Sequence, residues 1–461
     1  MIGVSPDSKN SPFAVGNVRL FIWFRLFFNA RFYYPVFTVL FLDFGLSIEQ
    51  FALLNAAWAA TIVLLEVPSG ALADALGRRN LLVLAGALMV VEMALLCFVP
   101  RGNPELLFAV FLVNRILSGA AEAAASGADE ALAYDSLAKA GNAGGWGLVL
   151  ERQMRVQSAG FVVAMSLGAA VYDPDLVGKL LAWAGSPVTV TAATTLRFPV
   201  YLTLAMAVMT LVTALRMREA AVAAPGCAEG KIDPCGRSMA QAFKLTVQAG
   251  SWILKSPVAL VTLSAGLVFD SCVRMAVTLV SQYYRLIQLP EAIFGLIGSA
   301  MALIGLFVPR LARRLVETRS PRFNFILLAL LIGAGLYGMS RMVPVFGIIP
   351  VAMLSAAMVL LQFFQSHYLN QLTPSAQRAT VLSFRGLSLN LAYGLIGILY
   401  SVLVAVLRRG AEPGLSPELI ENRVFVASMG WFPWAFALLT LALLFIARKK
   451  LRGSPWPGQR G

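Results

Sequence analysis

The stretch Gly70-Ala-Leu-Ala-Asp-Ala-Leu-Gly-Arg-Arg79 decides the fold. It joins two long apolar runs, 48–69 and 80–99, and is too short to be a domain of its own. Its two glycines allow a tight turn and a close approach of helices, while its Asp and Arg side chains can pair across neighbouring helix ends. The stretch therefore predicts a charged turn between two membrane-spanning helices.

The rest of the chain is as apolar as these two runs. Of its 461 residues 59% are hydrophobic and only 13% are charged, and the mean hydropathy is +0.76. Such a composition is typical of a chain surrounded by membrane lipids. The formal charge is +14, but Lys and Arg lie mostly in short segments between apolar runs, as membrane topology requires. We therefore expect no nucleic-acid partner.

About twelve segments are long enough to cross a bilayer, since a spanning helix needs about 20 mostly apolar residues. They cover approximately 18–42, 48–69, 80–99, 104–128, 148–172, 190–215, 256–284, 290–311, 323–341, 343–370, 379–407 and 424–447. Between the sixth and the seventh, the residues are rich in Ala, Gly, Pro and mixed charge. We therefore expect an N-terminal six-helix bundle (1–215), a cytoplasmic central loop (216–255) that includes an interfacial helix, and a C-terminal six-helix bundle (256–461) with a short basic tail.

The positions of the positive charges predict the orientation. Alternate connections are rich in Lys and Arg, while the intervening ones are acidic or mixed. Cytoplasmic loops carry the excess of positive charge in membrane proteins, so both termini are predicted to be cytoplasmic. Arg25 and Arg31 interrupt the first apolar run, which is unlike a cleaved signal peptide, and we expect the run to stay as the first helix.

A weak internal repeat supports two similar halves. The residues from Gly305 to Arg314 can be laid on the opening stretch 235 residues earlier, with Pro309 where the first copy has aspartate. A second pair of segments, which begin at Tyr134 and Tyr368, has nearly the same offset. Parallel repeats of this kind build many transporters. The predicted fold class is an all-α membrane protein with two pseudo-symmetric six-helix bundles.

Two motifs carry a resemblance to a known family. The opening stretch resembles the major facilitator superfamily signature G-x-L-a-D-r-x-G-R-R/K, and Arg115-Ile-Leu-Ser-Gly119 resembles its R-x-x-Q/S-G element in the fourth helix. Further stretches, including the one from Glu66 to Gly70, are similar to those of uncharacterised bacterial facilitator-type permeases. The resemblance implies the twelve-helix fold of this superfamily and a place in a bacterial inner membrane. The fifth helix lacks the Gly-Pro ending of drug/proton exporters, which weakens an antiporter assignment.

The resemblance also implies roles for individual residues. It places a conformational latch, which favours one access state, on Gly70, Asp74, Gly77, Arg78 and Arg79. The alternative is that the two arginines only anchor the chain by the positive-inside rule. The resemblance further assigns proton coupling to Arg115.

Carboxylates in the predicted helices are the partners that Arg115 needs. An arginine inside a spanning helix costs about 2.5–3.5 kcal/mol, so it should face the bundle and have a partner. The candidates are Glu122, two turns away on the same face, and Glu92. Asp270 is a third candidate for proton coupling, because it can pair with Arg274 four residues later and take up a proton when it loses that partner. A static ion pair explains the same residues.

Polar residues in the first, seventh and tenth helices are the candidates for substrate binding, because these helices line the cavity in the superfamily. They are Asn29, Arg31, Tyr34, Arg274, Gln362, Gln365 and His367. Arg31 suits an anionic group, or pairs with Glu92, Glu122 or Asp270. Gln362 and Gln365 lie three apart and could bond one polar solute together, and His367 is either a proton relay or a structural donor.

On the cytoplasmic side, an acidic cluster predicts an inner gate. Asp129, Glu130 and Asp135 face Arg152 and Arg155 across the link between the fourth and fifth helices. Salt bridges between the two groups would open and close a gate, while a static brace explains the same residues.

Several kinds of function are excluded or disfavoured. Four cysteines without CxxC spacing and a single histidine predict no metal site, no disulfide framework and no cofactor. The G-x-S-x-G, Walker A and H-E-x-x-H motifs are absent from the sequence, so no enzyme is expected. We expect a monomeric secondary transporter, symporter or antiporter, that moves a small anionic or zwitterionic solute with protons by alternating access. The alternatives are a lipid flippase or multidrug exporter of the same fold, and a non-transporting membrane sensor.

Overall fold

A computed structural model describes residues 11–186, 188–219, 234–373, 378–410 and 414–451. Within its helices, the side chains of 70, 71, 74, 75, 234–242, 245, 249, 306 and 378–380 are outside the description. Every regular element in the described residues is a helix, as the apolar sequence predicts.

Polar caps followed by proline set where many of the helices begin. Asn103 accepts a hydrogen bond from the Leu106 amide (3.1 Å), and Pro104 occupies the first turn of α5 (Pro104–Ala125). Ser320 caps α15 (Pro321–Ser340) and Ser416 caps α18 (Pro417–Lys450) in the same way. A side-chain oxygen at this position satisfies an amide of the first turn, and proline has no amide to satisfy.

The chain divides into two compact units. The first contains residues 1–35 and 61–242, and the second contains residues 36–60 and 243–461. The predicted division at 216–255 remains a prediction. The second unit also includes residues 36–60, from the end of the first predicted span and the start of the second.

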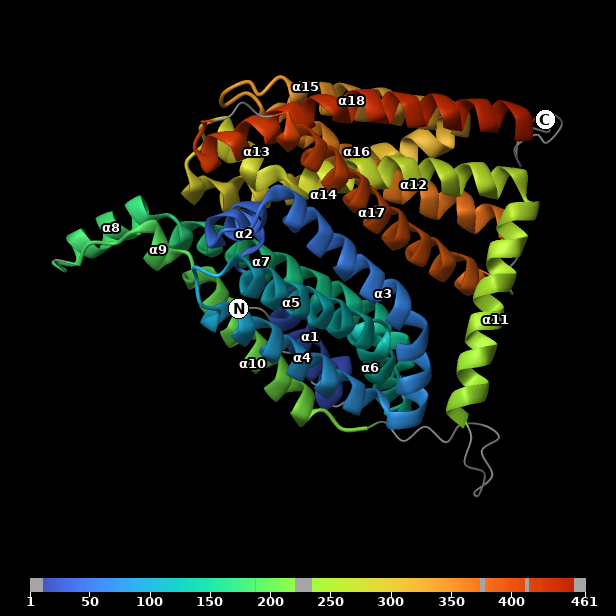
Figure 1. Cartoon of the computed structure of the whole chain (residues 1–461). Helices are drawn as coiled ribbons and strands as arrows, with labels where there is room; N and C mark the ends of the chain where they lie inside the picture. The colour runs from blue at the N-terminus through green and yellow to red at the C-terminus, as the bar shows by residue number, and fades with distance from the viewer. Residues whose placement is uncertain (1–10, 187, 220–233, 374–377, 411–413, 452–461) are drawn as a thin grey trace, which may run out of the picture. The chain divides into compact units, whose positions relative to one another are not determined.

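In the first unit, α4 packs between α5 and α10, and α1 packs on α6, α7 and α10 (Figure 1). The bounds of the helices of this unit are α1 Gly16–Asn29, α4 Arg78–Phe98, α5 Pro104–Ala125, α6 Ala128–Lys139, α7 Trp146–Tyr172, α8 Pro174–Trp183, α9 Ala192–Thr195 and α10 Phe198–Arg216. Glycines allow α7 to approach the first helix closely. A Cβ on Gly168 would lie 1.8 Å from the Phe32 carbonyl oxygen, and one on Gly160 would lie 2.1 Å from Leu26 Cδ1.

In the second unit, α12 packs on α15, α16, α17 and α18. The bounds here are α2 Phe37–Phe44, α12 Pro257–Thr278, α13 Val280–Leu286, α14 Phe294–Thr318, α15 Pro321–Ser340, α16 Ile348–Leu372, α17 Arg378–Arg409 and α18 Pro417–Lys450. Two helices, α3 (Ile48–Leu76) and α11 (Pro234–Lys255), pass from one unit to the other. Small residues form a seam between α17 and the first half of α3. A Cβ on Gly397 would lie 3.2 Å from the Ala52 carbonyl oxygen, and one on Gly394 would lie 3.4 Å from the Ala59 methyl carbon.

The first predicted span is broken. Eleven helices among the described residues are long and apolar enough to cross a bilayer, and together with this broken span they agree with the twelve-helix fold. The prediction of one continuous helix over 18–42 is wrong, because α1 ends at Asn29 and α2 begins only at Phe37. Pro35 lies in the gap, and proline removes a helical amide bond and clashes with the preceding turn.

Part of the predicted interfacial helix is described. The C-terminal half of α11 buries Ile253 against Leu263 of α12 and Val381 of α17. Phe243, Val247 and Leu254 are exposed on this helix. Its role as an interfacial helix stays a prediction, since most side chains of its first half lie outside the description.

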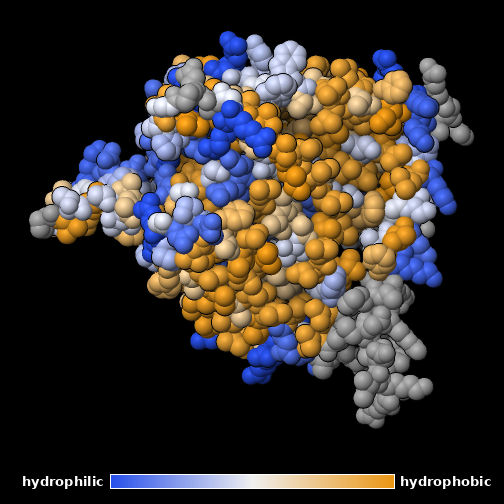
Figure 2. Space-filling model, viewed as in Figure 1, coloured by the Kyte–Doolittle hydropathy of each residue, from blue (hydrophilic) through white to orange (hydrophobic). Residues whose placement is uncertain are grey.

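The surface of the helices is largely apolar. Figure 2 shows hydrophobic residues over most of the face that it displays, with hydrophilic residues toward its margins. Exposed large side chains include Leu64, Leu303, Leu330 and Trp434. Such a surface suits lipid contact, and the chain is a multi-pass membrane protein.

Candidate functional site

The break in the first helix places a buried ion pair inside the first unit. Arg31 lies in the unwound segment, is 3% exposed, and donates from Nη1 to Oε1 of Glu92, which is fully buried in α4. Of the alternatives that the sequence left open for Arg31, the structure contains the pairing with Glu92. The Asn114 side chain donates to the Glu92 carbonyl oxygen (2.8 Å) and ties α5 to the same position.

Other polar groups surround this pair. Tyr33 and Tyr34 follow it in the chain, and both lie within electrostatic range of Arg31 and of Arg115. Arg115 is 5% exposed on α5, whereas Glu122 on the same helix is exposed. Glu122 is also within electrostatic range of Arg31. The unit therefore gathers two arginines and two carboxylates beside an unwound backbone.

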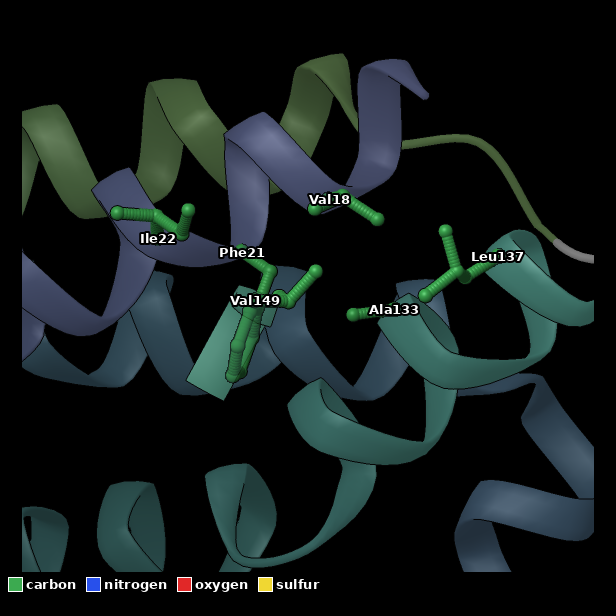
Figure 3. Close-up of a cluster of buried hydrophobic side chains, with 6 residues drawn as sticks. All are labelled: Val18, Phe21, Ile22, Ala133, Leu137 and Val149. Atoms are coloured by element: carbon green, nitrogen blue, oxygen red, sulfur yellow. The ribbon is translucent and has the colours of Figure 1, made fainter. Parts of the chain in front are cut away.

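A second ion pair joins α1 to α6. Arg25 bonds Asp129 through Nη2 (3.0 Å) and Nε, and Glu130 through Nη2 (3.0 Å). An apolar cluster of Val18, Phe21 and Ile22 from α1 with Ala133, Leu137 and Val149 sets the two helices side by side near this pair (Figure 3).

The predicted partners of the acidic cluster are different in the structure. Arg155 bonds Glu151 within its own helix (2.6 Å), and Asp135 bonds Arg78. The acidic residues meet Arg25 and Arg78 instead, because α6 packs on α1 and α4. The prediction of a gate that pairs them with Arg152 and Arg155 is not supported by these contacts.

The described part of the predicted latch is a junction of α4, α6 and α10. Gly77 has a positive φ of 87°, where a side chain is strained, and its Cβ would lie 2.8 Å from Glu219 Oε2. The Glu219 carboxylate accepts from the Arg78 and Arg79 amides (3.2 and 2.9 Å), at the N-terminus of α4 where a negative charge is stabilised.

The two arginines of the motif have separate partners. Arg78 bonds Asp135 of α6, while Arg79 donates to the carbonyl oxygens of Met217 (2.8 Å) and Leu215 (3.0 Å) at the end of α10. The side chains of Gly70 and Asp74 lie outside the described residues, so the latch as a whole stays a prediction.

In the second unit, Asp270 and Arg274 form the ion pair that their spacing predicts. Arg274 Nη2 lies 2.6 Å from Oδ2 of Asp270, which is 3% exposed. Arg274 also donates to Asn390 Oδ1 (3.0 Å) and lies over the Tyr393 ring (5.3 Å). Both of these partners belong to α17, so this helix and α12 hold the Arg274 guanidinium between them.

Arg385 of α17 is a further charged residue at this position. It lies within electrostatic range of Asp270, and its Nε and Nη1 atoms are buried without a hydrogen bond in the described part of the chain. The sequence did not single out Arg385, because it stands outside the first, seventh and tenth predicted helices, which supplied the substrate candidates. A lone arginine within the apolar run 379–407 was the available signal.

The remaining substrate candidates make separate contacts. Gln365 is 2% exposed and donates to the Thr262 carbonyl oxygen (3.4 Å), whereas Gln362 is exposed, so the two do not form a shared binding face. His367 Nε2 lies 3.0 Å from Gln371 Nε2. Asn29 donates to the Arg25 carbonyl oxygen within α1 (2.8 Å). Tyr34 remains 46% exposed.

Two arginine-centred clusters, which we call the outer clamps, hold residues 36–60 in the second unit. In the first clamp, Arg285 bonds both oxygens of Asp43 (2.7 Å each) and Glu291 (2.8 Å). In the second, Arg408 bonds Glu49 (2.7 Å) and Glu421. A cavity of about 490 Å³ lies among these residues. Asp43 and Glu49 flank one of the acidic connections from which the orientation was predicted, and the sequence predicted no partner for either.

Among the residues that the structure describes, no group of three or more His, Cys, Asp or Glu side chains could hold a metal ion. Cys97 and Cys272 are buried free thiols.

Comparison with known families finds one match over most of the chain. The profile described as Major Facilitator Superfamily matches residues 20–398. None of the curated proteins matches this sequence.

Solved structures share the fold at low sequence identity. A mutant of the nucleoside transporter NupG has a TM-score of 0.67 at 13% identity, over 95% of this chain and 100% of that one. A bacterial homologue of the human lysosomal transporter Spinster, inward-facing and unoccupied, has a TM-score of 0.66 at 17% identity, over 99% and 100%. A D-xylose-proton symporter has a TM-score of 0.60 at 14% identity, over 94% and 97%. Identities this low show a common fold only.

Proposed function

Since the chain belongs to the major facilitator superfamily, and is therefore of a transporter family rather than an enzyme family, we propose that it moves a small organic solute by alternating access, driven by protons. The two units would act as the six-helix bundles of such a transporter. The site of action would be the inner membrane of a bacterium, with both termini cytoplasmic and the chain working as a monomer.

The broken first helix is the observation that carries this proposal. Irregular backbone among membrane-spanning helices is tolerated where it is buried in protein or lines a cavity, and transporters build substrate sites from such interrupted helices. Here the unwound segment holds Arg31 on Glu92 and leaves Tyr34 exposed. We assign substrate contact to this segment.

Proton coupling is assigned to carboxylates within the two units. Asp270 is buried on Arg274 in the second unit, and Glu122 lies near Arg31 in the first. A carboxylate that exchanges an arginine partner for a proton changes its charge without leaving its helix, which is the step that coupling requires. The motif from Gly70 to Arg79 would act as the cytoplasmic latch.

The test is gradient-driven flux. Purified full-length protein is screened by thermal shift against metabolites, drugs and lipids, and each stabilising compound is then assayed in proteoliposomes with and without a pH gradient. We expect accumulation that depends on the gradient and is abolished in Asp270→Asn. If every stabilising compound binds without flux, the chain is a sensor and the transport proposal fails. If only lipids move, it is a flippase and the organic-solute proposal fails.

A further inference from the structure

The charges between α12 and α17 do not balance. Asp270 is buried on α12, with Arg274 on its own helix and Arg385 on α17. One carboxylate therefore faces two guanidinium groups, and these three groups carry a net charge of +1. The pair of helices is in direct contact, and both belong to the second unit.

Arg274 already has its partners. Its two terminal nitrogens bond Asp270 (2.6 Å) and Asn390 (3.0 Å), and its guanidinium lies over the Tyr393 ring. The Tyr393 hydroxyl lies in turn 3.0 Å from Thr278 Oγ1 on α12. Arg274 is thus held from both α12 and α17, and the Asp270 carboxylate is bonded to it.

Arg385 is held differently. Its Nε and Nη1 atoms are buried and make no hydrogen bond with any residue that the structure describes, although Asp270 is within electrostatic range. Burying the donors of a charged group without a bond is costly. An oxyanion that accepts from these donors would offset this penalty.

The same charges disfavour cationic and neutral solutes. A cation would be repelled by the excess positive charge, and a neutral solute would leave that excess uncompensated. A carboxylate or phosphate group supplies the missing negative charge, and guanidinium donors match the oxygens of either group.

We propose that Arg385, next to the Arg274–Asp270 pair, binds the carboxylate or phosphate group of a small organic anion, and that this anion is the transported solute. The proposal rests on the transport function above and names its substrate class. Arg385 is the specificity-determining residue, because it supplies the unbonded donors.

The first experiment measures binding with probes that differ only in charge. Acetate, succinate and benzoate are each compared with the corresponding neutral amide, and inorganic phosphate and methyl phosphate are compared with trimethyl phosphate, at constant ionic strength. The thermal unfolding midpoint of the purified full chain is followed in wild type, Arg385→Gln and Arg385→Lys. The control is Arg313→Gln, an arginine of the same unit whose side chain is 68% exposed.

We expect at least one anion to stabilise the wild type and the control while its neutral analogue does not. The apparent affinity should fall about 10- to 100-fold in Arg385→Gln and less in Arg385→Lys, as for the loss of one charge-assisted bond. The carboxylates and the phosphates, compared with each other, identify the group. The proposal is overturned if no anion exceeds its neutral analogue, or if Arg385→Gln binds as the wild type does.

A second measurement needs no ligand. Ser388→Cys places a thiol one turn from Arg385, in a background where Cys227 and Cys235 are serine and the buried Cys97 and Cys272 remain. Its reaction with a sulfonate-bearing methanethiosulfonate is compared with that of a trimethylammonium-bearing one. Arg385 should favour the anionic reagent by about threefold or more over Arg385→Gln, since a fixed charge concentrates counter-ions. Equal ratios in the two backgrounds overturn the proposal.

The outcomes distinguish failure of the anion site from failure of transport. Gradient-driven flux of a neutral or cationic solute, without an anion effect, overturns the anion site and leaves the transport function in place. Anion binding that depends on Arg385, without any flux, supports the site and contradicts transport.

Discussion

At the scale of residues, the Arg31–Glu92 pair is the most deeply buried charge in the described chain. Its side chains are 3% and 0% exposed, and Glu92 Oε2 has no hydrogen-bond partner there. Removing two charges from water costs several kcal/mol per ion, and an incompletely bonded pair recovers only part of this cost. The pair therefore adds little stability over apolar residues, and its value lies in holding the unwound segment on α4.

The first prediction concerns this pair. Glu92→Gln should lower the free energy of unfolding by about 3–5 kcal/mol, because it leaves the buried Arg31 without its counter-ion. Arg31→Met combined with Glu92→Leu should recover most of this loss and abolish solute flux. Denaturant titration in detergent and the proteoliposome assay measure the two effects. If the double variant is as unstable as the single one, the penalty does not come from the unpaired arginine.

The sequence predicted the charged residues of the site better than their partners. Intramembrane charge alone singled out Arg31, Glu92 and Asp270, because each stands in an apolar run where a charge is expensive. Short-range spacing also predicted the Asp270–Arg274 contact, which lies within one helix. The sequence left several possible partners for Arg31. Pairing between helices depends on how the helices pack, and the sequence alone does not give that geometry.

At the scale of elements, the glycines of α7 explain how the first helix can be broken and still be buried. Gly160 and Gly168 lie two turns apart and face the residues around the end of α1. The missing side chains let the α7 backbone approach the unwound Phe32, whose amide donates to Thr203 Oγ1 of α10 (3.1 Å). The glycine-rich fifth spanning helix thus shapes the broken segment, whether or not it has a Gly-Pro ending.

The second prediction tests this packing. Gly168→Ala should destabilise the protein by about 1–3 kcal/mol, because its Cβ would lie 1.8 Å from the Phe32 carbonyl oxygen and force the backbones apart. Thermal unfolding in detergent measures the loss.

Gly430→Ala in α18 is the matched control, since nothing lies within 4 Å of its Cβ. It should leave stability unchanged or raise it by up to about 1 kcal/mol, because alanine favours helices. Equal effects of the two substitutions would mean that the close approach of α7 is not required.

Helix existence and starts could be predicted, while the interruption could not. Long apolar runs and proline after a polar cap mark α5, α15 and α18 directly in the sequence. A continuous helix over 18–42 was expected because the residues of the break are, apart from Arg31, aromatic or apolar. Pro35 was the local signal for a break. Proline is tolerated in membrane helices when neighbours satisfy the freed backbone groups, so Pro35 alone does not predict an interruption.

At the scale of the whole molecule, the chain changes unit at the break. Residues up to Pro35 belong to the first unit, residues 36–60 to the second, and α3 returns to the first. The outer clamps are what hold residues 36–60 in the second unit by charge. Each arginine is about 30% exposed, so salt in solution can weaken its bonds.

The third prediction tests the clamps. Arg285→Gln combined with Arg408→Gln should leave four carboxylates without their cations and release residues 36–60 from α13, α17 and α18. Leu46→Cys, at a position 4% exposed beside the cavity, should then react with a water-soluble maleimide about tenfold faster, which corresponds to about 1.4 kcal/mol.

Raising the salt concentration should speed the reaction in the wild-type background and have little further effect in the variant. Arg313→Gln removes an exposed arginine elsewhere in the unit and should change nothing. Unchanged reactivity in the double variant would show that packing alone keeps these residues in place.

The attachment of residues 36–60 also depends on the seam of Gly394 and Gly397 against Ala52 and Ala59. This seam makes the attachment sensitive to small displacements. At these glycines α17 faces only the backbone and methyl groups of small residues, so the two helices can part there without an exchange of rotamers. Dispersion between such flat surfaces falls by about a quarter to a half over a gap of only 0.5–1 Å. Once the ion pairs have separated, a displacement of this size removes up to about half of the attraction at the seam. The attachment of residues 36–60 to α17 should therefore be two-state: the segment is either bound or released, with few intermediate positions.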